Sequence, residues 1–101
     1  MKFGLKDETV QRISGIFATF PELTEAILYG SRAMGTFKNG SDIDLTLKGT
    51  GLDLTLVNRI RLKLDDLLLP YTFDISIFDQ IDNPDLIDHI ERVGLIFYKK
   101  V

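Results

Sequence analysis

Two short segments of this chain alternate polar and apolar residues, a pattern that predicts β-strands with one polar face. They cover residues 42–48 (DIDLTLK) and 71–78 (YTFDISIF). Because residues i and i+2 of a strand share a face, each segment places acidic and hydroxyl side chains on one side. Branched and aromatic side chains fall on the other side. If the two strands are neighbours in a sheet, their polar faces coincide.

The other segments predict an α+β fold, layered, with a mixed sheet of about four strands flanked by helices. Apolar residues at helical spacing predict helices over residues 7–20 and 53–69, each followed or ended by a proline. Residues 25–29 and 95–99 are the remaining predicted strands. A short helical turn is expected over residues 32–36, and Asn83 and Pro84 open a last helix through residue 93.

Size and composition predict a single domain over residues 1–101. Cysteine is absent, which excludes disulfides and thiolate metal sites. No apolar run approaches the roughly 18 residues of a membrane span, and the first residues lack the core of a signal peptide. We therefore expect a cytoplasmic protein without membrane contact. A net charge of −3 argues against long nucleic acid as a partner.

Three aspartates and one small turn are the candidate site. Asp42 and Asp44 share the polar face of one strand, and Asp74 lies in the middle of the other. Carboxylates this close repel each other unless cations neutralise them. Three acids can hold two Mg²⁺ ions roughly 3.5–4 Å apart. Gly30 and Ser31, at the end of an apolar strand, offer a turn that suits phosphate, so the set predicts metal-assisted phosphoryl or nucleotidyl chemistry.

In this order, the residues resemble the minimal nucleotidyltransferases of the DNA-polymerase-β-like superfamily. The family pattern is an apolar strand, Gly-Ser, about a dozen residues, Asp-x-Asp, and a third acid on a later strand. This chain has ILYGS at 27–31, DID at 42–44 and Asp74. The resemblance covers nearly the whole chain and implies a palm-like fold.

The resemblance also implies a reaction that uses two Mg²⁺ ions and a nucleoside triphosphate. Asp42 and Asp44 would bind the metals, and Asp74 would complete the second metal site and help to deprotonate an acceptor hydroxyl. A nucleoside monophosphate, AMP from ATP, would pass to that hydroxyl as pyrophosphate leaves.

The phosphate side of the implied site departs from the family pattern. Gly30 and Ser31 would hold the β- and γ-phosphates, with Arg32 and Lys38 as nearby cations. Many relatives carry an arginine where this chain has Met34, which removes part of the usual charge neutralisation.

The family further implies a partner, because larger relatives carry an acceptor-binding domain that is not visible here. In the minimal family this partner is commonly a small helical HEPN-type protein. Such pairs resemble toxin–antitoxin systems, in which AMP on a tyrosine silences the toxin. Leu54, Leu62 and Leu69 lie off the main apolar stripe of their helix; they form either a docking patch of a homo- or hetero-oligomer or packing at the sheet edge.

Simpler interpretations remain for single residues. The glycine–serine turn alone could merely end a strand, and Asp74 could belong to a structural ion pair. Arg32 could brace the turn rather than contact phosphate, and Lys38 could be a solvated loop charge. His89, on the polar side of the last helix with no second histidine nearby, is expected not to bind a metal.

Two other functions remain open at this point. The chain could be a catalytically weak module that neutralises its partner by occlusion, for which Met34 is the main support. It could also transfer to a small molecule or tRNA, which the absence of a basic surface disfavours. The sequence leaves open the nucleotide, the acceptor and the oligomeric state.

Overall fold

The computed structural model describes residues 1–101 and contains four strands in one mixed sheet. The strand order is β3-β2-β1-β4; β1 is antiparallel to β2 and to β4, whereas β2 and β3 are parallel. The predicted α+β fold is therefore confirmed. The elements in chain order are α1 (Asp7–Ala18), β1 (Leu23–Tyr29), α2 (Gly30–Met34), β2 (Ile43–Gly49), α3 (Leu54–Asp65), β3 (Phe73–Ile77), a 3₁₀ turn η1 (Phe78–Gln80), α4 (Pro84–Val93) and β4 (Leu95–Lys99).

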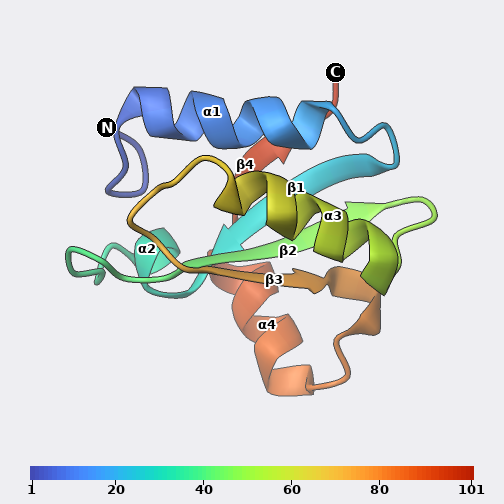
Figure 1. The fold of residues 1–101 in the computed structure, drawn as a ribbon. Helices are drawn as coiled ribbons and strands as arrows, with labels where there is room; N and C mark the ends of the chain where they lie inside the picture. Colours follow the sequence, from blue (N-terminus) through green and yellow to red (C-terminus); the bar gives the residue numbers. More distant parts are fainter.

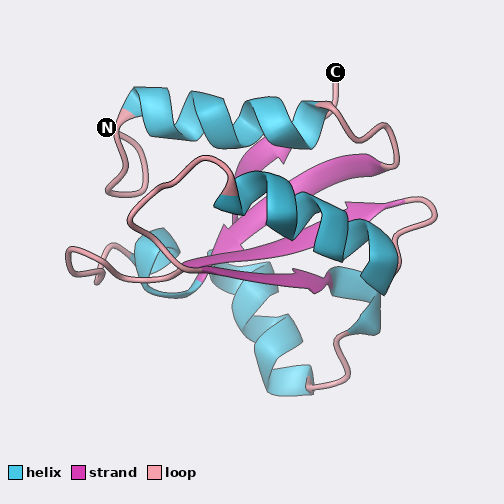
Figure 2. Ribbon diagram, in the orientation of Figure 1, coloured by secondary structure: helices cyan, strands magenta, loops and turns pink.

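The sheet forms the middle of three layers. Helices α1 and α3 cover one face and α4 lies against the other (Figures 1 and 2). A cluster of 17 buried hydrophobic residues fills the space beneath α1 and α3. It includes Leu45, Leu47 and Ile75 from the predicted apolar sides of β2 and β3. The polar sides of these two strands consequently face away from this core.

Several element ends differ from the predictions. Helix α3 stops at Asp65 rather than at residue 69, because the backbone N–H groups of Leu67 and Leu68 bond to carbonyls only three residues back. Leu68 then takes a left-handed conformation, with φ of 55°, which turns the chain back toward β3. Strand β2 begins at Ile43, so Asp42 belongs to the loop before it. The predicted helical turn over residues 32–36 is found at residues 30–34, and Gly35 ends it in the left-handed conformation.

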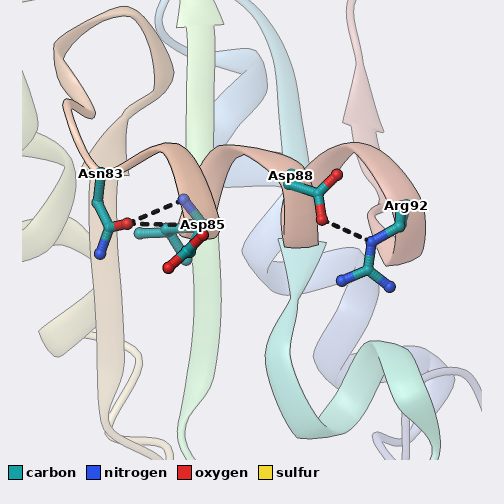
Figure 3. Close-up of polar contacts among 5 residues, drawn as sticks. Asn83, Asp85, Asp88 and Arg92 are labelled. Carbon is teal, nitrogen blue, oxygen red and sulfur yellow. Dashed lines mark hydrogen bonds and ion pairs between the residues drawn. The ribbon is translucent and has the colours of Figure 1, made fainter.

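Helix α4 has well-defined ends and a fixed position. The Asn83 side chain accepts hydrogen bonds from the backbone N–H groups of Asp85 and Leu86, at 3.0 and 3.4 Å, directly before the first-turn proline (Figure 3). Farther along the helix, Arg92 pairs with Asp88 one turn back (Figure 3). Ile90 packs against the underside of β1, which fixes α4 beneath that strand.

The predicted leucine patch on α3 is present only in part. Leu54 and Leu62 are 71% and 65% exposed, but Leu69 packs against the main core. None of the helices has the length and apolar character needed to cross a membrane.

Candidate active site

Three side chains stand in one row on the polar face of the sheet. Asp44 of β2 pairs in register with Asp74 of the parallel strand β3, and with Tyr29 of the antiparallel strand β1. Register partners in a sheet point to the same face, so the prediction that Asp44 and Asp74 share a face is confirmed. In the next row the Ser76 hydroxyl donates to the Thr46 hydroxyl at 3.0 Å. These rows lie on the same face of the sheet as α4.

The carboxylates of this row have no cationic partner. The ion pairs of the chain are Met1 with Asp7 and Asp88 with Arg92, so the alternative of a structural ion pair for Asp74 is wrong. Burial raises the pKa of Asp44, and the nearby charges of Asp74 and Asp42 raise it further. Asp42 and Asp74 are exposed, whereas Asp44 is half-buried. The site therefore concentrates negative charge that an added cation would relieve.

Gly30 brings the start of α2 against Asp44. Strand β1 runs directly into this helix, and Gly30 joins them with φ of 74°. A Cβ atom at this position would collide with Oδ2 of Asp44. Glycine is thus required both by the backbone conformation and by the close approach. The predicted turn and Asp44 therefore lie in direct proximity, with Ser31 next in the helix.

The Arg32 side chain is directed away from Asp44 and Asp74. Its side chain is 3% exposed, and its guanidinium donates to the carbonyl of Ser41 at 2.9 and 3.2 Å and to that of Phe3 at 3.0 Å. The rings of Phe37 and Tyr71 lie 5.2 and 5.0 Å from it. The structure therefore shows the bracing alternative, in which Arg32 ties the loop after α2 to the N-terminal segment.

The remaining residues predicted beside the phosphates are solvent-facing. Lys38 is exposed on the loop after α2, where its backbone N–H binds the Ser41 hydroxyl at 2.8 Å. Met34, at the position of the family arginine, is 50% exposed. Neither residue adds a cation in contact with the acid pair.

His89 contacts the start of α2 and the Tyr29 ring, a position beside the acid row that was not predicted from the sequence. The backbone N–H of Gly30 donates to Nε2 of His89 at 3.1 Å. The imidazole also lies edge-on to the Tyr29 ring, with centroids 6.1 Å apart and planes at 82°. A positive charge on the imidazole would lower the pKa of Asp44, against the stronger raising effects. The available signal was its spacing three residues after Leu86, on the side of α4 that packs on the sheet.

The acid row suits a hard divalent cation. Mg²⁺ takes one or two protein carboxylates and completes its shell with phosphate oxygens and water, which the Asp44 and Asp74 pair can supply in part. No three His, Cys, Asp or Glu side chains lie close enough together to hold one ion. The expected gathering of three acids is thus an adjacent pair with Asp42 as a nearby charge.

Comparison with protein families identifies the fold family. The family described as polymerase beta, nucleotidyltransferase matches residues 11–101. The chain belongs to this nucleotidyltransferase family. A comparison with curated proteins finds no match.

Solved structures share the fold of this nucleotidyltransferase. A chain of a toxin–antitoxin structure with AMP-PNP superposes with a TM-score of 0.70 and 21% identity, covering 95% of this chain and 75% of that one. A chain of the tri-AMPylated Shewanella oneidensis HEPN toxin in complex with MNT antitoxin gives 0.70 and 17%, covering 95% and 74%. A putative nucleotidyltransferase from Sulfolobus solfataricus gives 0.50 and 18%, covering 96% and 92%. At these identities the likeness concerns the fold.

Proposed function

We propose that this nucleotidyltransferase transfers AMP from ATP to a tyrosine hydroxyl of a HEPN-type partner protein and so acts as its antitoxin. The observation that carries the proposal is the Asp44 and Asp74 pair, in register, without cations and against the turn at Gly30. The family supports the transferase chemistry. The nucleotide and the acceptor are suggested by structures of the same fold, one with AMP-PNP and one of an AMPylated HEPN toxin with its antitoxin.

The residues of the candidate site divide the tasks of this reaction between metal binding, phosphate binding and proton transfer. Asp42, Asp44 and Asp74 would hold Mg²⁺ ions, which neutralise the triphosphate and polarise the α-phosphate. Gly30 and Ser31 would position the β- and γ-phosphates. The acceptor oxygen then attacks the α-phosphorus, the bond to the bridging β-oxygen breaks, and pyrophosphate leaves. Asp74, exposed at the outer strand, would take the proton of the acceptor hydroxyl.

Mass spectrometry of the partner tests this proposal. The purified chain, incubated with a HEPN-type partner, ATP and Mg²⁺, should add the mass of one or more AMP groups to the partner. The double variant Asp42→Asn with Asp44→Asn should abolish the addition. Asp65→Asn with Asp66→Asn is the matched control, because it removes two adjacent charges from an exposed site on another element. An unchanged partner mass with wild type and each of the four nucleotides would contradict the proposal.

Neutralisation by occlusion is the second candidate, and the phosphate side of the site favours it. Arg32 is committed to backbone carbonyls and Met34 is apolar, so few cations remain for a triphosphate. Dose dependence separates the candidates. A transferase should neutralise the partner at far below equimolar amounts. An occluding module should need one copy per partner, and its double Asp→Asn variant should still work at that dose.

A further inference from the structure

We propose that His89 is a positioning residue of the transfer site, whose Nε2 holds Gly30 in place so that Ser31 faces the phosphates of the nucleotide. The inference rests on the proposed function and adds a residue to it. It starts from the 3.1 Å hydrogen bond between the Gly30 N–H and Nε2, which joins residues 59 positions apart in the chain.

The bond satisfies a group that α2 itself cannot satisfy. The first N–H groups of a helix have no acceptor one turn back, and Gly30 is the first residue of α2. Its N–H is partly buried, so losing the acceptor would leave a donor without a partner. A ring nitrogen can accept only when it carries no proton, so Nδ1 must hold the hydrogen of the neutral imidazole.

The imidazole is fixed from several sides. The edge-on contact with Tyr29 holds one side of the ring. Its helix is anchored by Ile90 in the cluster beneath β1 and by the Asn83 cap at its start. A histidine on a freely solvated helix face would have no such ring contact. His89 therefore transmits the position of α4 to the start of α2.

The same bond sets the distance between the turn and the acid row. Gly30 lies so close to Asp44 that no side chain fits between them. A shift of the turn would therefore move Ser31 relative to Asp44, and with Ser31 the bound triphosphate relative to the carboxylates of Asp44 and Asp74. Small misplacements of this kind weaken a reaction strongly. Because His89 acts on the phosphate side, we expect its loss to raise the KM for ATP more than it lowers kcat.

Two substitutions with opposite expectations test the role. His89→Leu removes the acceptor, whereas His89→Gln keeps an oxygen that can accept from the Gly30 N–H. With ATP, Mg²⁺ and the partner, His89→Leu should raise the KM for ATP about tenfold or more, and His89→Gln should stay within about threefold of wild type. Glu91→Gln, an exposed change on the same helix, is the control. A purely structural role would lower the melting temperature of His89→Leu without this kinetic split or its rescue.

Nuclear magnetic resonance of the ¹⁵N-labelled wild-type chain gives a test that needs no transfer activity. The His89 ring should show an unprotonated Nε2, and the Gly30 amide should stay hydrogen-bonded when AMP-PNP and Mg²⁺ are added, while the Ser31 amide shifts. If wild type transfers nothing, the proposed function fails, but these spectra still decide the His89 contact. If His89→Leu does not fold, the glutamine variant and the spectra carry the test.

Two outcomes would overturn the inference. One is a KM for ATP in His89→Leu that equals or falls below that of wild type, which would mean that His89 is idle or blocks a donor that the phosphates need. The other is release of the Gly30 amide from His89 when the nucleotide binds.

Discussion

The two faces of the sheet satisfy their side chains in different ways. Beneath α1 and α3, 17 buried hydrophobic residues form one continuous cluster, whereas the face under α4 has a cluster of only 3. Beside that smaller cluster, Asp44 and Asp74 lie next to each other with no ion pair. The first face stabilises the fold through apolar burial. The second leaves charge unneutralised, which destabilises the free protein but prepares it for a cation and a triphosphate.

The largest effect is expected from a substitution on the acidic face under α4 that leaves the apolar face under α1 and α3 intact. Asp74→Asn removes the group that we place on the acceptor proton, and a general base typically contributes about 100- to 10,000-fold, so kcat should fall by that range. Steady-state transfer to the partner measures it. Asp79→Asn, an exposed acid just beyond β3, is the control and should retain wild-type kcat. Full activity in Asp74→Asn would remove this residue from the mechanism.

A change on the first face should act on stability alone. Leu45 is fully buried in the main cluster, and Leu45→Ala should lower the free energy of unfolding by about 2–5 kcal/mol. Leu62→Ala, at a side chain 65% exposed on α3, should change it by about 0.5 kcal/mol or less. Urea denaturation of both variants measures the contrast. Equal losses would show that the exposed part of α3 packs against something in solution.

Gly30→Ala tests the turn that joins β1 to α2 beside Asp44. The positive φ and the collision with the Asp44 carboxylate should together lower the free energy of unfolding by about 1–3 kcal/mol and abolish transfer. Gly15→Ala is the matched control, because Gly15 lies inside α1 and an added Cβ atom there would meet only open space. There the same substitution should stabilise the helix by about 0.5–1 kcal/mol. Thermal melts and the transfer assay follow both. A Gly30→Ala variant as active as wild type would contradict the close approach.

Local patterns sufficed to predict most of the fold. The alternation around Asp44 and Asp74 defined two strands and their polar sides, because a strand shows its period in a few residues. Asn83 and Pro84 similarly marked the start of a helix. The early end of α3 was missed because the pattern of leucines continues past Asp65, whereas the left-handed Leu68 depends on the path back to β3.

The parts of the site that could not be predicted depend on contacts distant in sequence. A cation after a Gly-Ser pair looks like a phosphate ligand, but the carbonyls of Phe3 and Ser41 fix Arg32 elsewhere. His89 has no cysteine or second histidine nearby in sequence and meets Gly30 only because α4 packs beneath β1. The periodicity of apolar residues predicts which face of a helix is buried, but it does not predict which strand that face packs against.

The smallest expected effect concerns the charge stored on the second face. The pKa of Asp44 is raised in the folded chain, so the unfolded chain loses this proton first. The stability that protonated Asp44 contributes is therefore fully present at a pH below the pKa of Asp44 in the unfolded chain. It is lost as the pH rises through the pKa of Asp44 in the folded chain. Asp44→Asn should remove this loss and, without Mg²⁺ near neutral pH, stabilise the chain; because solvent screens the charge of a half-buried carboxylate, the gain should stay below about 1 kcal/mol, or below about 4–8 °C in Tm.

Melts of wild type and Asp44→Asn across acidic to neutral pH measure this difference. The gap between the two Tm values should widen as pH rises, and Mg²⁺ should narrow it by stabilising only the wild type. A gap that is constant with pH would mean that Asp44 is not the group whose charge opposes folding. A gap unchanged by Mg²⁺ would mean that the exposed acid face does not attract the cation for which its charge makes it suitable.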